Sequence, residues 1–291
     1  MSPRGESVPL RLCGALHALC IDGRAWLADV YPPHKKPDDV VWHLINHAFE
    51  SETDFINTFL NSAPQTNEVR RSVGLIAAGH WLADRINLPF VTSELGASAG
   101  LNLNWNHYGM VVQGQHFGAP EPILTLHPDW NGPLPPNTAP HVVDRAGVDL
   151  NPLDPHRDSL RLRAYLWPDQ PERLTLTTAA IAAAQMPDMG DAIDWLEPRL
   201  TTPRNGHLHL IYHTIAWQYF PLAVQARGNE LIMAAGARAT DNAPLAWLGM
   251  EGDGNTLGAA LTLRLWPGDG APIRLARVDY HGRWVNWLAP P

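Results

Sequence analysis

Cysteine is scarce in this sequence, with Cys13 and Cys20 as the only two in 291 residues. Seven positions apart on a helix, their Cα atoms would lie roughly 10 Å from one another, which is too far for a disulfide bond. Two thiols without a disulfide framework are typical of the reducing cytoplasm. We therefore expect a cytoplasmic protein whose fold does not depend on disulfide bonds.

Long hydrophobic runs are also missing. The N-terminus has no apolar run after a basic start, so we expect no signal peptide. No run approaches the roughly 20 apolar residues that a membrane-spanning helix needs. The sequence therefore predicts a soluble protein without a membrane partner.

Positive charge is in deficit, because 21 Lys and Arg stand against 29 Asp and Glu, which gives a net charge of −8. Nucleic-acid-binding domains usually need a basic face that neutralises phosphates. Arg70, Arg71 and Arg85 on one predicted helix are too few for such a face. We expect a small-molecule substrate and no nucleic-acid partner, with the oligomeric state left open.

Histidine is plentiful, at 14 residues, but its spacing does not favour a metal site. His207 and His209 alternate on one face of a predicted strand and could chelate together. His213 shares that face but lies roughly 20 Å from His207, and the pair sits at the wrong end of the strand for a ligand pocket. We expect no metal.

The first 88 residues have a helical pattern. Apolar positions recur with helical spacing over residues 8–30 and 40–60. Ser62, Pro64 and Gln65 resemble a capping box with a proline in the first turn, and predict a third helix that runs to about Asn87. We interpret residues 1–88 as an N-terminal helical region.

From Leu88 onward, predicted strands alternate with predicted helices. Strands are expected at 89–95, 141–150, 207–213 and 245–250, with helices between them, and a hairpin turns at Gly268–Gly270. Such alternation implies a mostly parallel sheet, to which the hairpin adds an antiparallel pair. This is the layout of class I methyltransferases. We therefore expect an α/β, Rossmann-like domain over 89–291, with a proline- and glycine-rich insertion at about 107–141 that forms a hairpin or lid.

A glycine turn follows the first predicted strand. Gly96 permits a tight turn, and small residues let the backbone approach a ligand, while the next helix offers free N–H groups. The acidic residue before the turn could meet the amino acid part of S-adenosylmethionine. The turn alone is as consistent with an ordinary strand–helix connection. Its candidate cofactor-binding residues are Glu94, Gly96, Ala97, Ser98, Gly100 and Asn102.

Further polar residues end the later strands. Asp149 could accept both ribose hydroxyls, and Asp191, next to Ala192, could accept from the adenine amino group, although both could instead cap helices. His213 ends the strand expected at 207–213 and is the candidate general base or acceptor-orienting residue. Trp217 follows it and could flank a ligand.

The run before the third helix is dense in polar side chains. It is either a solvated first turn, in which Glu68 is favoured by the helix dipole, or a cover for the pocket that contacts substrate. The candidate substrate residues in this run are Gln65, Asn67, Glu68 and Arg70.

The glycine turn also fits Gly-x-Ser-x-Gly, the nucleophile elbow of α/β-hydrolases. Ser98 would be the nucleophile and His281 its base, with Asp253 or Asp269 to orient the histidine. No His-Gly-Gly stretch upstream offers an oxyanion hole, and Glu94 has no duty in an elbow.

Several of these motifs together resemble an uncharacterised bacterial family, domain of unknown function 2332. They are Gln65–Glu68, Glu94–Leu103, Gly147–Pro152, Leu166–Pro168, Gly190–Ala192 and His281–Trp284, and the resemblance runs from about residue 10 to 288. The family is similar to class I methyltransferases in its Rossmann core, so the resemblance implies the fold more than the function. From the residues at the strand ends, we expect S-adenosylmethionine as the cofactor. We expect a methyltransferase acting on a small molecule; the alternatives are a serine hydrolase and a non-catalytic nucleoside-binding or scaffold protein.

Overall fold

The protein, seen in a computed structural model that describes residues 7–255 and 257–290, divides into two compact units. The first consists of Met1–Asn67 with Asp154–Ala182, and the second of Glu68–Leu153 with Ala183–Pro291. In the sequence, residues 154–182 of the first unit therefore lie between the two segments of the second unit.

The first unit is helical, and it includes the helices expected within residues 8–30 and 40–60. Leu19 and Leu27 are fully buried in its core, and such burial stabilises by about 1.5–3 kcal/mol per side chain. Ala15, Ala48 and Ile56 complete the contact between the helices. The helices are α1 (Val8–Ile21), α2 (Ala25–Ala28), α3 (Asp38–Ser51), α4 (Thr53–Leu60), α6 (Ser159–Ala164) and α7 (Pro171–Ala183), of which α7 ends one residue into the second unit.

The predicted capping box at Ser62 is wrong. Helical structure begins only at the 3₁₀ turn η1 (Val69–Arg71), which continues as α5 (Ser72–Arg85). Pro64 disfavours helical geometry at the residue before it. The N-cap is Glu68, whose side chain accepts the N–H of Arg70 at 3.3 Å.

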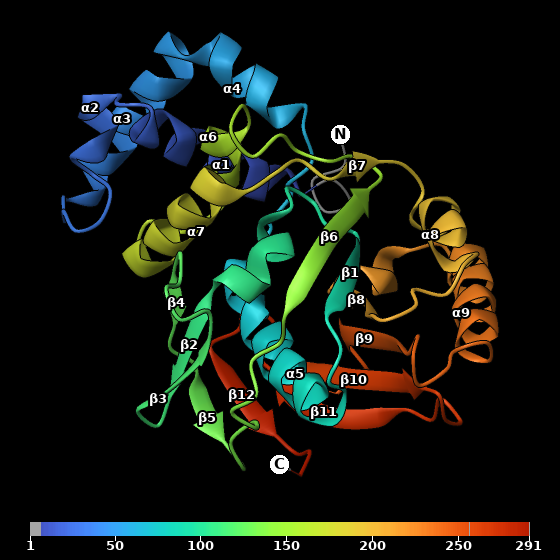
Figure 1. The fold of residues 1–291 in the computed structure, drawn as a ribbon. Coiled ribbons are helices and arrows are strands. Elements are labelled where there is room, and N and C mark those ends of the chain that lie inside the picture. The colour runs from blue at the N-terminus through green and yellow to red at the C-terminus, as the bar shows by residue number, and fades with distance from the viewer. Residues whose placement is uncertain (1–6, 256, 291) are drawn as a thin grey trace. The chain divides into compact units, whose positions relative to one another are not determined.

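A mostly parallel sheet dominates the second unit (Figure 1). Its central strand β1 (Phe90–Leu95) lies between β6 (Val142–Asp149) and β8 (Leu208–Thr214), and pairs in parallel with both. Beyond β6 lies β7 (Asp188–Met189), and beyond β8 lies β9 (Leu245–Glu251), also parallel. Every residue of β1 and β8 is buried, as expected for parallel strands covered on both faces. The strands predicted from the sequence are confirmed.

The far side of the sheet is antiparallel. The expected hairpin is confirmed as β10 (Ala259–Trp266) and β11 (Ile273–Val278), and β12 (Trp284–Trp287) extends it. Within the predicted insertion, β2 (Gly109–Val112) and β3 (Gln115–Gly118) form a hairpin that β4 (Thr125–Leu126) widens into a separate three-stranded sheet. The short strand β5 (Asp129–Asn131) instead joins the main sheet beside β12.

Helices cover both faces of the sheet. On one face lie α8 (Ala192–Leu200) and α9 (Leu222–Gly236) (Figure 1). Their residues Ile193 and Ile232 belong to one buried cluster with Leu95, Ile211 and Trp247 of the strands. On the other, α5 approaches β10 and β11 closely at Gly74. Among the described residues, no helix combines the length and apolar character needed to cross a membrane.

The strand order reverses at one position of the sheet. From β1 the chain first builds β6 and β7 on one side, and then returns to place β8 on the other. In open α/β sheets, ligands bind at the carboxyl ends of the strands where the order reverses in this way. That point lies between the ends of β1, β6 and β8.

At two glycines of α5, we expect substitution by alanine to have different effects on the stability of the fold. A Cβ at Gly79 would lie 2.7 Å from the ring of Trp105, whereas a Cβ at Gly74 would meet Leu261 at an ordinary 3.5 Å. We expect Gly79→Ala to destabilise the fold by about 1–3 kcal/mol through overpacking. Gly74→Ala, the matched control, should be neutral or stabilise by up to about 1 kcal/mol, because alanine favours helix. Urea unfolding of both variants measures the difference; equal effects would contradict the packing described.

Candidate functional site

The glycine turn is held by hydrogen bonds from its own backbone. The N–H groups of Gly96 and Ala97 both donate to the carbonyl of Val148, at 2.9 and 3.0 Å. Gly96 and Ser98 have positive φ angles, of 73° and 57°. A Cβ at Gly96 would lie 2.5 Å from Cβ of Ala216, so glycine is required there by both conformation and space.

Asp149 links this turn to the end of β6. One carboxylate oxygen accepts the N–H of Ser98 at 2.8 Å, and the other accepts the N–H of Asn151 at 2.9 Å. The carboxylate thus fixes the turn of one strand and the exit of its neighbour. As an acceptor with two lone pairs on each oxygen, it keeps capacity for further donors.

A cavity of about 150 Å³ opens beside Asp149, at the point that the strand order indicates. Four predicted cofactor residues line it, namely Gly96, Asp149, Asp191 and Ala192. Asp191 also caps α8, because its Oδ1 accepts the N–H groups of Ile193 and Asp194. Asp191 can therefore cap the helix and face the cavity at the same time, so its two predicted roles are compatible. We call this the carboxyl-end cavity; its other lining residues are Leu150, Gly190, Tyr219, Phe220, Pro221 and Val224.

Sequence reasoning missed the apolar wall of this cavity. Tyr219, Phe220, Pro221 and Val224 come from the segment that follows β8 and begins α9. An aromatic run directly after a predicted strand was the available signal, since strand ends form the crevice. Leu150 faces the same space from the end of β6.

The remaining predicted turn residues support the turn and do not line the cavity. Ala97, Ser98 and Asn102 are buried, and a Cβ at Gly100 would meet the carbonyl oxygen of Gln185. The expected helix after the turn is only a 3₁₀ segment, η2 (Leu101–His107). Two of its asparagines bond outside the segment: Asn102 accepts from the Ser72 hydroxyl and donates to the Glu68 carbonyl, and Asn104 donates to the Ala183 carbonyl. No α-helix N-terminus therefore faces a ligand at this turn.

Glu94 lies behind the turn, 1% exposed, among buried tyrosines. The hydroxyl of Tyr212 is 3.3 Å from Glu94 Oε2 and 3.2 Å from the carbonyl of Asn102. A hydroxyl has one proton, so both contacts are satisfied when a protonated Glu94 donates to Tyr212 and Tyr212 donates to Asn102. Burial, reinforced by the nearby charge of Asp149, raises the pKa of Glu94 well above its usual value, against the opposing effects of Tyr212 and Arg71.

The structure brings two other predicted residues together in a second cavity, of about 260 Å³. His213 and Trp217 line it, and their rings stack with centroids 5.1 Å apart. His213 Nδ1 is 2.7 Å from Glu251, and its Nε2 accepts from the indole of Trp247 at 3.1 Å. An indole N–H can only donate, so Nε2 carries the lone pair and His213 is neutral with its proton on Nδ1. Both nitrogens are thus engaged, which favours a positioning role. We call this the aromatic cavity.

The polar run before α5 is built around Glu68. This buried carboxylate accepts from the Arg70 backbone and guanidinium, and its Oε2 lies 3.4 Å from Nδ1 of His281. Gln65 and Asn67 are half-buried and belong to the first unit. A substrate role for these four residues stays a prediction.

The hydrolase arrangement is not assembled around His281. Its ring faces Glu68, while Asp253 is bound by Arg274 and Arg277, and Asp269 accepts the N–H of Ala271. Within residues 7–255 and 257–290, neither aspartate pairs with His281.

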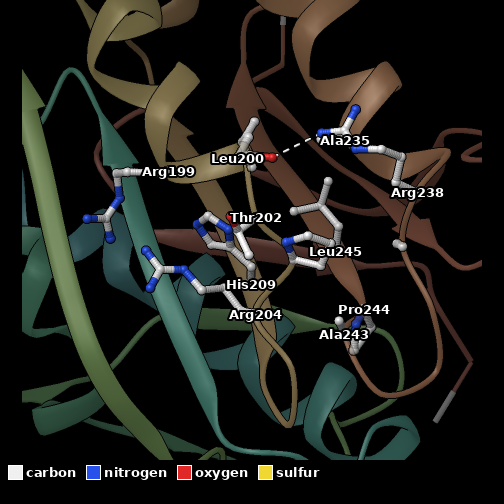
Figure 2. A pocket seen from close by; sticks show the side chains of 12 residues that line it. Arg199, Leu200, Thr202, Arg204, His209, Ala235, Arg238, Ala243, Pro244 and Leu245 are labelled. Atoms are coloured by element: carbon white, nitrogen blue, oxygen red, sulfur yellow. Dashed lines mark hydrogen bonds between the residues drawn. The ribbon is translucent and has the colours of Figure 1, made fainter.

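A third cavity lies at the amino ends of β8 and β9 and is lined by Arg199, Arg204, Arg238 and His209 (Figure 2). His209 bonds the hydroxyl of Ser93 at 2.8 Å, and burial, followed by the charges of Arg199 and Arg204, lowers its pKa to about 3. At about 20 Å³ the space holds little more than a water molecule. In the part of the chain that the structure describes, no group of three or more His, Cys, Asp or Glu could hold a metal ion.

Together, the sheet and the cavities at its carboxyl edge define an α/β protein with cavities at the edge where open α/β sheets bind their ligands. The sequence profile of a family described as "Uncharacterized protein conserved in bacteria (DUF2332)" matches residues 1–287, and the chain belongs to this family. No significant match was found among curated proteins or solved structures.

Glu94 makes stability depend on pH. Its carboxyl keeps its proton in the folded state at pH values where the unfolded chain has lost it, so stability should fall as pH rises above the ordinary value of 4.5. Glu94→Gln should flatten this fall, which reaches up to about 1.4 kcal/mol per pH unit, because glutamine cannot ionise yet can donate to Tyr212. Urea unfolding from about pH 5 to about pH 8 measures the slope.

Glu230→Gln, a change at an exposed position in α9, is the control and should keep the wild-type slope. An unchanged slope in Glu94→Gln would show that Glu94 is ionised in the fold.

Proposed function

We propose that the protein is an S-adenosylmethionine-dependent methyltransferase whose carboxyl-end cavity binds the nucleoside part of the cofactor. The observation that carries the proposal is the composition of that cavity: Asp149 and Asp191, from neighbouring strand ends, share one space with the apolar side chains of Phe220 and Val224. Carboxylates accept from ribose hydroxyls and from an adenine amino group, and apolar walls suit the base.

The charge of the cavity lining favours a nucleoside over a nucleotide. The residues described as lining the cavity include two aspartates and no lysine, arginine or histidine. The N–H groups of Gly96, Ala97 and Ser98, which could cradle a phosphate in an open loop, already bond Val148 and Asp149. Phosphate groups would therefore be repelled and left without donors, whereas a cationic nucleoside is favoured.

The volume of the cavity is consistent with enclosing one ring of the nucleoside. A cavity of about 150 Å³ is the volume that encloses a benzene-sized ring. Leu150 and Tyr219 line it while remaining largely exposed, so a longer ligand can extend past them. The mostly parallel sheet with antiparallel strands at one side supports the comparison with class I methyltransferases.

S-adenosylmethionine, when bound, supplies an electrophilic methyl group on a positively charged sulfur. The residues of this chain then have mainly to position the two reactants, which is the principal requirement of methyl transfer. Asp149 and Asp191 would hold the nucleoside. His213, fixed between Glu251 and Trp247, would orient the acceptor, while its role as a base would require breaking the bond from Trp247.

Calorimetric titration with S-adenosylmethionine and S-adenosylhomocysteine tests the proposal. We expect dissociation constants on the order of micromolar, as for a ligand of this size. Asp149→Asn should weaken binding by about tenfold or more, because it removes charge-assisted hydrogen bonds. Asp269→Asn is the matched control, since Asp269 accepts the N–H of Ala271 two residues on, just as Asp149 accepts that of Asn151. A folded wild-type protein that binds neither compound would refute the proposal.

A steric block at Gly190 gives a second test. A Cβ there would meet nothing closer than Val148 at 4.0 Å, so a side chain can be added without displacing the fold. Gly190→Phe should fill the cavity and weaken nucleoside binding by at least about tenfold, while Gly190→Ala should bind as the wild type does. Thermal unfolding verifies that both variants fold. If Gly190→Phe bound the nucleoside as tightly as the wild type, the nucleoside would bind at another place and the proposed site would be wrong.

A further inference from the structure

The aromatic cavity is a site in its own right, built on one row of the sheet. His213 of β8, Gly249 of β9, Thr262 of β10 and Arg274 of β11 are successive register partners, and all four line it. Register partners lie side by side on the same face of a sheet, so these strands form a continuous floor. Its volume of about 260 Å³ exceeds the roughly 150 Å³ that accommodates benzene, which leaves room for a substituted or fused ring.

The walls of this cavity are aromatic and fixed in position. Trp217 and Trp247 lie with ring centroids 5.3 Å apart at an interplanar angle of 60°, and each is only 9% exposed. The bond from Trp247 to His213 and the stacking of His213 on Trp217 lock the three rings together. A Cβ at Gly249 would lie 2.7 Å from the imidazole, so glycine makes space for this arrangement. Such preorganised rings favour a planar aromatic ligand.

Both carboxylates that line the cavity are satisfied by the protein. Glu251 accepts from His213 and from the backbone N–H groups of Ala216 and Trp217, and these bonds lower its pKa despite the opposing effect of burial. Asp253 is paired with Arg274 at 3.2 Å and with Arg277 at 2.8 Å. Neither offers an unmatched negative charge to a ligand.

Arg264 is the charge that remains unmatched. Its Nη1 donates to the carbonyl of Gly270 at 2.6 Å, and no carboxylate of the described residues lies within ion-pair distance of it. Arg264 is the register partner of Trp247, and Thr262, two residues away on the same face, is the partner of Gly249. A guanidinium and a hydroxyl therefore stand beside an aromatic wall, which is an arrangement suited to an anionic group.

We propose that the aromatic cavity binds a planar aromatic anion, with its ring against Trp217 and Trp247 and its carboxylate or phosphate at Arg264 and Thr262. The site is separate from the carboxyl-end cavity, although one segment contributes to both. Trp217 lines the aromatic cavity and Phe220 lines the carboxyl-end cavity, and their ring centroids are 5.4 Å apart. The proposal concerns binding alone and stands whether or not the protein binds a nucleoside.

Calorimetric titration of the full chain with 2-naphthoate, 2-naphthyl phosphate and neutral 2-naphthamide tests the site. The wild type should bind at least one anion about tenfold or more tightly than the amide, because the amide cannot form the charge-assisted bond to Arg264. The tighter anion identifies the acidic group. Arg264→Gln should bring the anion and amide affinities within about threefold of each other, since only the charge is lost. Arg227→Gln, a change at a surface arginine paired with Asp194 and Glu197, should keep the wild-type preference.

Indole N–H resonances place the ligand. Single Trp→Phe variants assign the indole N–H resonances of the 12 tryptophans. The resonances of Trp217 and Trp247 should shift most when the anion is added. Three results would overturn the proposal: no binding of any probe by the folded wild type, equal binding of anion and amide, or an unchanged preference in Arg264→Gln.

Discussion

The bond between the Asp149 carboxylate and the Ser98 N–H, at 2.8 Å, is the interaction on which the site depends. It joins the turn after the central strand to the exit of its neighbour, and the second carboxylate oxygen fixes that exit at Asn151. Because Gly96 and Ala97 donate to Val148, the backbone N–H groups of residues 96–98 all have acceptors within the protein. The glycine turn therefore does not form a phosphate cradle. The ligand that we propose for the cavity is argued instead from its carboxylates and apolar walls.

The same turn separates two different environments. On one side lies the carboxyl-end cavity; on the other lies a fully buried network in which Glu94, Tyr212 and Asn102 satisfy one another. Because a buried polar group without a partner is costly, this network fixes the conformation of the segment that follows the turn. Glu94 consequently supports the turn from behind, and the carboxylates that line the carboxyl-end cavity are those of Asp149 and Asp191.

The sequence predicts the strands well because their signal is local: short runs rich in apolar residues, of which one ends at the glycine turn and another at Asp149. It fails where structure depends on partners distant in the chain. The helix predicted after Gly100 is a 3₁₀ segment because Asn102 and Asn104 bond groups far away in sequence. The joining of α6 and α7 with the N-terminal helices has no local signature either. The convergence of strand ends predicts that Asp149, Asp191 and Gly96 lie close together, and all three line the carboxyl-end cavity. Phe220 and Val224 line it too, and were missed because apolar residues at a helix start also suit a core.

A crystal structure of the protein grown with S-adenosylhomocysteine at saturating concentration tests the central claim most directly. The account predicts density for the adenosine group in the carboxyl-end cavity, with a ribose hydroxyl about 2.7 Å from the Asp149 carboxylate. It also predicts that the bonds of Gly96 and Ala97 to Val148 persist. An empty cavity, or a nucleoside bound at another part of the molecule, would contradict it.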